Sequence, residues 1–247
     1  MRHDLTTATL RVRDMYRVGY DVLRRNGMHM LLLLVATAIP AAAVETGLNG
    51  YFDVDPLAAT NVGYGMLSTT AAWLVNAIAM IYLMQLTADD LRERRVAADA
   101  LFTVVARRYI PLLVGYFLTM LLFLIGMVLF IVPGIIVMVL LAFFPSFMVI
   151  ENDGIFDSFG NSYRLVKGHF FHVLGMSLAL MLPMLVVVLV LQSAVTNAVT
   201  QFLALAIGNA LNFYFVIMIT VFFLNVRQTW REEGTDVGAA AETSAAQ

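Results

Sequence analysis

The sequence contains no cysteine and unusually little charge. Only 13% of its 247 residues are Asp, Glu, Lys or Arg, whereas soluble proteins usually contain about 25%. Without cysteine the chain can form no disulfide, thiolate nucleophile or Cys-ligated zinc site. With 61% hydrophobic residues and a mean hydropathy of +0.84, the composition indicates a membrane protein. The net charge of −2 provides no basic field for nucleic acid.

Charge is also missing from long continuous segments. The block from Tyr109 to Ile150 contains no Asp, Glu, Lys, Arg or His. A helix needs about 20 apolar residues to cross the hydrocarbon core, so this block is about twice as long as one crossing. Pro133 and Gly134 lie within it, and neither favours a continuing helix. We predict two crossings joined by a tight turn at these residues; one long kinked or re-entrant helix is the alternative.

The same arithmetic divides the other apolar sequence into four further crossings, two of them separated by a polar patch at 193–201. We therefore predict an all-α polytopic membrane protein with six transmembrane helices in a single domain over residues 1–231. The predicted crossings are at about 27–44, 66–88, 109–131, 135–150, 169–192 and 202–226. Residues 232–247 are mostly small and polar, which predicts a disordered cytoplasmic tail.

Positive charge is absent from one side of this predicted topology. All 15 Lys and Arg residues fall in the N-terminal segment, the loops at 89–109 and 151–168, and the segment after the sixth crossing. The loops on the other side carry acidic residues instead, such as Glu45. Because Lys and Arg are retained on the cytoplasmic side, both termini are predicted to be cytoplasmic. A signal peptide cleaved near Ala43 is an alternative, but it would leave five crossings and spoil the charge partition.

A short amphipathic pattern precedes the first, third and fifth crossings, at about 12–25, 97–108 and 156–170. The chain is thus predicted to form three membrane hairpins, each preceded by a short amphipathic helix on the cytoplasmic side. These helices either anchor the hairpins or turn basic residues toward anionic lipid. The predicted membrane-surface basic face comprises Arg11, Arg13, Arg17, Arg24, Arg25, Arg107, Arg108, Arg164 and Lys167.

The third amphipathic helix has an aromatic side and a polar side. In a helix of this kind the apolar side lies down toward the bilayer and the polar side lies opposite. The predicted apolar side comprises Phe156, Phe159, Tyr163, Val166 and Phe170, and the polar side comprises Asp157, Asn161, Arg164 and Lys167.

Acidic and basic side chains are absent from the predicted membrane cores, which counts against a proton-coupled transporter or an intramembrane acid–base enzyme. Asn76, Asn209 and Asn212 form a candidate polar cluster within the membrane. Such residues either line a path for a substrate or form hydrogen bonds between helices.

His169 and His172 have a spacing that could suit a metal, but no third ligand is nearby. We predict no metal, cofactor or catalytic residue.

One segment, IGMVLFIVPGIIVMVLLAFFPSFMVIENDGIFDSFGNSYRLVKG, resembles the core of the YciC-like bacterial inner-membrane proteins. It is also similar to the membrane domain of some glycerophosphodiester phosphodiesterases. The shared features are the Pro133–Gly134 tip, Glu151 in the acidic loop, and the helix from Asp157 to Lys167. The resemblance implies a six-helix, non-catalytic protein of the bacterial inner membrane, because the phosphodiesterase chemistry of the second family resides in a separate soluble domain.

These observations predict an integral membrane protein, not an enzyme, that organises lipid or a partner protein. Its expected partners are membrane lipids, with a membrane protein or a second copy of the chain as a further expectation, and no nucleic acid. The alternative is a passive or facilitative transporter of a small solute or lipid that uses Asn76, Asn209 and Asn212.

Overall fold

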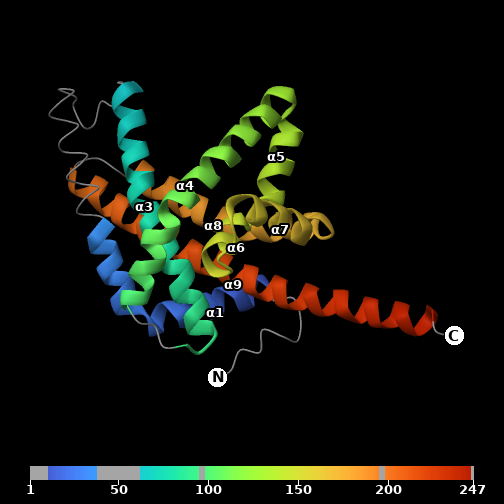
Figure 1. Cartoon of the computed structure of the whole chain (residues 1–247). Coiled ribbons are helices and arrows are strands. Elements are labelled where there is room, and N and C mark those ends of the chain that lie inside the picture. The colour runs from blue at the N-terminus through green and yellow to red at the C-terminus, as the bar shows by residue number, and fades with distance from the viewer. Residues whose placement is uncertain (1–10, 38–61, 95–97, 195–197, 246–247) are drawn as a thin grey trace.

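The computed structural model describes residues 11–37, 62–94, 98–194 and 198–245, and the side chains of the last helix as far as Trp230. The regular elements in these ranges are helices (Figure 1). A further apolar helix, Gly27–Thr37, follows the first labelled one. The labelled helices are α1 (Val12–Arg25), α3 (Val62–Leu91), α4 (Ala98–Leu129), α5 (Ile131–Leu140), α6 (Phe144–Ile150), α7 (Ile155–Lys167), α8 (Phe170–Ser193) and α9 (Ala198–Ala245).

Five helical segments are long and apolar enough to cross a membrane, which makes the chain a multi-pass membrane protein. They are Thr70–Leu91, Ala100–Val128, Ile131–Ile150, Phe170–Ser193 and Ala206–Trp230. These segments coincide with the second to sixth predicted crossings. The first predicted crossing starts in the Gly27–Thr37 helix and continues into residues outside the described ranges. An arrangement of six crossings as three hairpins therefore stays a prediction.

The long uncharged block does fold back on itself, but the chain turns before Pro133 rather than at it. Phe130 is fully extended (φ −166°, ψ 153°) and separates α4 from α5. Pro133 lies in the first turn of α5, where its missing N–H removes no intrahelical hydrogen bond. The α4–α5 hairpin projects away from the other helices (Figure 1). Its two helices meet where Gly126 faces Gly134, because a Cβ on Gly126 would lie 2.8 Å from the Gly134 Cα.

Two of the three predicted amphipathic helices are separate elements, and the middle one is not. Residues 98–108 run without a break into α4. Leu101 and Val105 are buried, so the predicted apolar side of this segment does pack on the core. The chain has no glycine between 98 and the crossing, and Pro111 is accommodated inside the helix. Nothing local therefore ends the helix, and the segment becomes the first turns of α4.

The centre of the packed core is α6, whose seven residues are all buried. Phe144 makes edge-to-face contacts with Tyr116 of α4 and Phe159 of α7, with ring centroids 5.0 and 5.1 Å apart. Phe147 makes the same kind of contact with Phe223 of α9, at 4.9 Å. Such pairs are worth about 1 kcal/mol each beyond the area they bury. The helix is thus enclosed by protein rather than exposed to lipid.

Ser162 of α7 closes the break between α5 and α6. Its hydroxyl donates to the Leu140 carbonyl (2.8 Å) and accepts from the Phe143 N–H (3.2 Å), and the side chain is fully buried. These two backbone groups would otherwise lack partners, because the break interrupts the helical hydrogen-bond ladder. The sequence did carry a signal for the break, since Pro145 lies at the start of α6 and proline favours the first turn of a helix.

Ser162→Ala is expected to lower the free energy of unfolding by about 2 kcal/mol, because it leaves a buried carbonyl and a buried N–H unpaired. Thermal unfolding of the full chain in lipid nanodiscs measures the effect. Ser158→Ala is the matched control: Ser158 is also buried on α7, but its hydroxyl donates only to the Gly154 carbonyl. That carbonyl also accepts the Ser158 N–H at 2.9 Å, so the control leaves it paired. Equal losses in the two variants would contradict the assigned role of Ser162.

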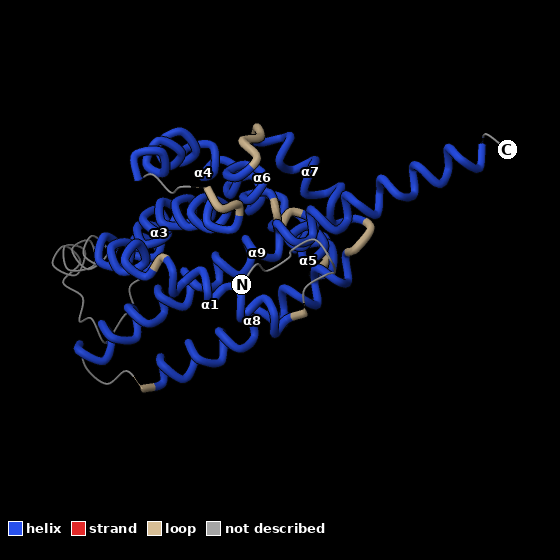
Figure 2. The backbone as a smooth tube through the Cα atoms, turned by 90° about the horizontal axis from the view of Figure 1, so that it is seen from below, coloured by secondary structure: helices blue, strands red, loops and turns tan. Residues whose placement is uncertain are grey.

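The last helix extends beyond the membrane segment. It continues to Ala245 and projects from the body of the protein (Figures 1 and 2). A disordered tail over 232–247 stays a prediction. Alanines at 239–241 have the highest helix propensity of any residue and favour this continuation.

Candidate functional site: a charged end of the helices

Charged side chains from four parts of the chain converge on the loop between α6 and α7. The Glu151 Oε1 accepts hydrogen bonds from Arg92, which follows α3, at 3.2 Å, and from Arg227 of α9. Arg108 of α4 donates to the backbone carbonyls of residues 152 and 153, at 2.7 and 3.0 Å. We call Arg92, Arg108 and Arg227 the arginine cluster. It fixes α3, α4 and α9 to one loop.

The loop has a conformation that aims its carbonyls at Arg108. Asn152 adopts a positive φ of 65°, a left-handed conformation that asparagine tolerates better than most residues. The Asp153 N–H donates to the Phe147 carbonyl at 3.3 Å, and the Asp153 Oδ2 accepts from the Asn161 Nδ2 at 2.7 Å. The loop is therefore held from both α6 and α7, independently of the arginines.

The ion pairs at Glu151 are partly shielded from solvent. The Glu151 side chain is 19% exposed, and those of Arg92 and Arg227 are each 31% exposed. Hydrogen bonds between charged groups are stronger than neutral ones, and a second guanidinium helps to compensate for desolvation of the carboxylate. Two positive charges meet one negative charge at this contact, so the contact itself carries a net positive charge.

The end of α1 belongs to the same charged region. The Arg25 Nη1 lies 3.5 Å from the Asp90 Oδ2 at the end of α3. Together with the arginine cluster, this contact places the N-terminal segment, the start of the 89–109 loop, the 151–168 loop and α9 at one end of the helices. These are the four segments that the sequence predicts on one side of the membrane.

The apolar side of α1 packs on the bundle instead of on lipid. Met15, Val18 and Val22 are fully buried, and α1 contacts α9 most extensively. The Tyr214 hydroxyl donates to the Tyr16 carbonyl at 2.7 Å, and the Tyr16 hydroxyl donates to the Leu180 carbonyl at 3.4 Å. Burial raises the pKa of Tyr16, which keeps this hydroxyl protonated as a donor. These contacts anchor α1 to α8 and α9.

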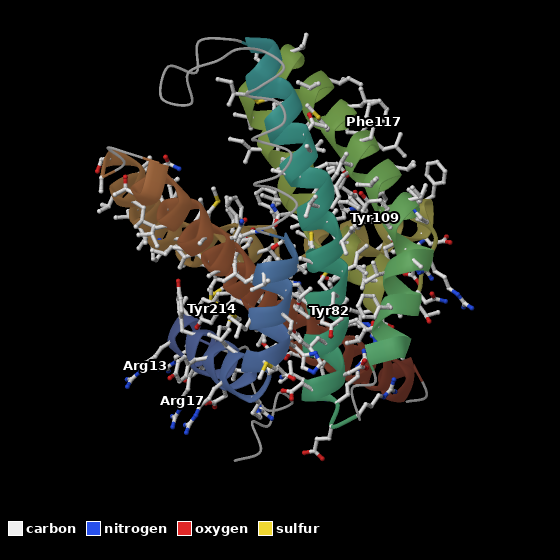
Figure 3. The ribbon with its side chains drawn as sticks, turned by 90° about the vertical axis from the view of Figure 1, so that its left-hand side faces the viewer. Arg13, Arg17, Tyr82, Tyr109, Phe117 and Tyr214 are labelled. Carbon is white, nitrogen blue, oxygen red and sulfur yellow. The ribbon has the colours of Figure 1, made fainter. Side chains whose placement is uncertain are left out.

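The opposite side of α1 is basic and faces outward. Arg11, Arg13 and Arg17 are exposed and, with Asp14, line an open hollow of about 640 Å³. Arg13 and Arg17 point away from the helices (Figure 3). The other members of the predicted basic face divide into two groups. Arg25, which is exposed, and Arg108, which is half-buried, bind protein acceptors. Arg24, Arg107, Arg164 and Lys167 are exposed.

The predicted polar residues of the membrane region do not form a hydrogen-bonded group in the described part of the chain. The Asn76 Oδ1 on α3 is buried and has no hydrogen-bond partner. On α9, Asn209 is half-buried and Asn212 is exposed. A role for these residues in a path or in packing stays a prediction.

The two histidines at the start of α8 lie against an aromatic side chain. The His169 ring stacks on Trp230 of α9, with centroids 3.7 Å apart and planes 13° apart. The His172 ring meets the same Trp230 edge-on at 6.1 Å. No group of three or more Asp, Glu or His in the described ranges could hold a metal ion.

Arg92, Arg227 and the pairing role of Glu151 were not predicted from the sequence. The available signal was a carboxylate directly after an uncharged span, which needs a partner when it lies near the membrane. Nothing in one sequence identifies that partner, because Arg92 and Arg227 are 59 and 76 positions away from Glu151.

Comparison with known proteins gives one family match. A family model described as a domain of unknown function (DUF7847) matches residues 119–229. No curated protein and no solved structure matches the chain. The chain is therefore a multi-pass membrane protein that contains an uncharacterised domain. The matched region includes Glu151, all of α7 and Arg227, but it begins after Arg92 and Arg108.

Proposed function

We propose that the chain is a non-catalytic membrane module that organises lipid or a partner protein at the cytoplasmic face of a bacterial inner membrane. The arginine cluster carries this proposal. Its side chains bind a carboxylate and two carbonyls of the protein itself, so they build a rigid charged platform where α3 ends and where α4 and α9 pass the α6–α7 loop. The exposed arginines of α1 extend this platform and are suited to anionic headgroups.

The proposed topology has six crossings and cytoplasmic termini. The distribution of all Lys and Arg residues supports it, as does the shared position of the four basic segments at one end of the helices. The resemblance to the YciC-like proteins supports the assignment to an inner membrane. A second copy of the chain or another membrane protein is a proposed partner beside lipid.

Single-cysteine labelling tests this topology, and the wild-type chain has no Cys to interfere. An impermeant thiol reagent added to intact cells should label a cysteine in a periplasmic loop and should not reach one on the cytoplasmic side. Labelling of Ala98→Cys in intact cells would contradict the six-crossing topology. The periplasmic test positions are Thr46, Asn61 and Thr196, and the cytoplasmic ones are Ala98, Asn161 and Thr235.

Replacing Arg11, Arg13 and Arg17 together with Gln is expected to reduce the amount of anionic lipid retained by the purified full-length protein. Each basic residue near an anionic surface contributes about 1 kcal/mol, so three should produce a large loss. Native mass spectrometry of protein released from nanodiscs measures the retained lipid. The whole chain is needed because the apolar side of α1 packs on α8 and α9.

Asp14→Asn is the matched control, because it removes a negative charge from the same hollow. This variant should retain at least as much anionic lipid as the wild type. Added salt should weaken retention by the wild type and have little effect on the triple variant. If the triple variant retains as much anionic lipid as the wild type at all salt concentrations, the arginines of α1 do not make the proposed lipid contact.

Passive transport is the second candidate, and one observation favours it. The Asn76 Oδ1 is buried without a partner, and such a group has an unused acceptor that a passing polar solute could occupy. Solute flux in proteoliposomes tests the idea. Flux that Asn76→Leu abolishes, and that Thr220→Val leaves unchanged, would replace the organising role with transport. Thr220 is a suitable control because its hydroxyl is already paired with the Val216 carbonyl at 2.7 Å.

A further inference from the structure

The α7 helix divides its aromatic residues between two sides, which the sequence pattern alone does not predict. Its buried stripe consists of Ser158, Ser162 and Val166, at intervals of four residues. Serine is small enough to let α7 approach the α5–α6 break, where Ser162 forms its two hydrogen bonds. Phe159 packs on the core beside this stripe. Phe170 also packs on the core, whereas Phe156 and Tyr163 of the predicted apolar side are left outside the protein.

The outward side of α7 combines aromatic and basic side chains. Phe156 is 78% exposed and Tyr163 is 42% exposed. Arg164 and Lys167 are exposed on the same side, and the Lys167 Nζ lies 5.5 Å from the centroid of the Tyr163 ring. Phe171, in the first turn of α8, continues this side and is 84% exposed. We call these five residues the α7 outer face.

Both ends of α7 lie at the charged end of the helices. Its N-terminal end follows the loop that Arg108 and Arg227 hold. Beyond its C-terminal end, His169 stacks on Trp230, one turn after Arg227 on α9. The helix therefore runs along this end, between the membrane segments Ile131–Ile150 and Phe170–Ser193. In the proposed topology this end is the cytoplasmic end of the membrane segments, where the hydrocarbon core meets the headgroups.

The chemistry of the α7 outer face matches that boundary. Large aromatic side chains are unfavourable in water and are enriched at the membrane–water interface. Basic residues beside them can reach the lipid phosphates while their aliphatic stems cover apolar surface. We propose that the α7 outer face is an interfacial anchor, with Phe156, Tyr163 and Phe171 inserted at headgroup level and Arg164 and Lys167 on anionic phosphates. This inference deepens the proposed lipid-organising function and rests on it.

The test uses nitroxide probes on the full-length protein in nanodiscs. A probe is attached at Phe156→Cys or Phe171→Cys, and its collision rates with oxygen and with a water-soluble nickel complex are measured. The ratio of the two rates reports depth in the bilayer. Met120→Cys, on the exposed apolar surface of α4, gives the hydrocarbon reference. Glu93→Cys, in the exposed segment after α3, gives the aqueous reference.

Both α7 probes are expected to give ratios between the two references. In nanodiscs of anionic phosphatidylglycerol, Arg164→Gln with Lys167→Gln should move them toward the aqueous value. In nanodiscs of neutral phosphatidylcholine the same pair of substitutions should have little effect. Each probe replaces one of the proposed anchoring aromatic residues. The two positions are therefore measured in separate variants, and agreement between them shows that losing one anchor does not change the depth.

Three results would overturn the proposal. Ratios equal to that of Glu93→Cys would show that this side faces water. An immobilised probe that neither reagent reaches would show that protein, such as a second copy of the chain, covers it. Identical depths in the two lipids, unaffected by loss of both charges, would show that Arg164 and Lys167 do not bind anionic phosphates. The proposed lipid contact of α1 is tested separately, with the triple variant of Arg11, Arg13 and Arg17. The interfacial anchor on α7 can therefore fail while the proposed function stands, and the two failures are distinguishable.

Discussion

Gly126→Ala is expected to lower the free energy of unfolding by about 3 kcal/mol, the upper end of the range for overpacked cores. A Cβ at this position would lie 2.8 Å from both the Cα and the N of Gly134, and 3.1 Å from the Pro133 carbonyl carbon. These are backbone atoms of the facing helix, so no side-chain rotation can relieve the contact. The two helices would have to separate at the point where the α4–α5 hairpin is narrowest.

Two glycine variants provide a graded comparison for this hairpin. A Cβ on Gly134 would meet the flexible Met127 side chain at 2.8 Å and the Met127 backbone N at 3.2 Å, so Gly134→Ala should cost less than Gly126→Ala. Gly175→Ala, in membrane helix α8, is the matched control, because a Cβ there has no neighbour within 4 Å. The control should be neutral or stabilising by about 0.5–1 kcal/mol.

Thermal unfolding in nanodiscs ranks the glycine variants. The expected order of stability is Gly175→Ala, then Gly134→Ala, then Gly126→Ala. If Gly126→Ala unfolds at the same temperature as Gly175→Ala, the helices do not meet at Gly126. Changing Pro133 to Ala should have a smaller effect than Gly126→Ala, because Pro133 occupies a position that other residues can also adopt.

The membrane segments were predictable because their signal is additive along the chain. Length and lack of charge identify a span such as Phe170–Ser193 without knowledge of its neighbours. The turn near Pro133 was harder, since proline is compatible both with a turn and with the first turn of a helix. In the structure Pro133 lies in the helix, and the chain turns at Phe130, an apolar residue with no turn preference.

The face of α7 was predicted with the correct period but divided incorrectly. Hydrophobicity alone assigns Phe156 and Phe159 to the same side as Val166, because aromatic residues outweigh serine in any such scale. Close approach to the α5–α6 break instead requires the small side chains of Ser158 and Ser162. Tertiary packing therefore rotates the buried stripe away from the most hydrophobic direction. The same limit applies to the arginine cluster, which depends on contacts between segments distant in the chain.

Glu151→Gln is expected to lower the free energy of unfolding by about 2 kcal/mol, through loss of charge with almost no change in shape. Removing one member of a buried ion pair typically costs about 3–5 kcal/mol. The side chains of Glu151 and of its two arginines are 19–31% exposed, so solvent screens part of this energy. The loss remains substantial because one substitution leaves both Arg92 and Arg227 without their carboxylate.

A double-mutant cycle with Arg227→Gln separates this pairing from unrelated effects of either change. If the pair couples as the structure shows, the double variant should lose less stability than the sum of the two single losses. Glu93→Gln is the matched control, because Glu93 is exposed in the segment that follows α3 and should tolerate loss of its charge. Strictly additive losses at positions 151 and 227 would mean that α9 is not held to the α6–α7 loop by this contact. The charged platform would then rest on Arg92, which still pairs with Glu151, and on Arg108, whose hydrogen bonds to two backbone carbonyls do not depend on any carboxylate.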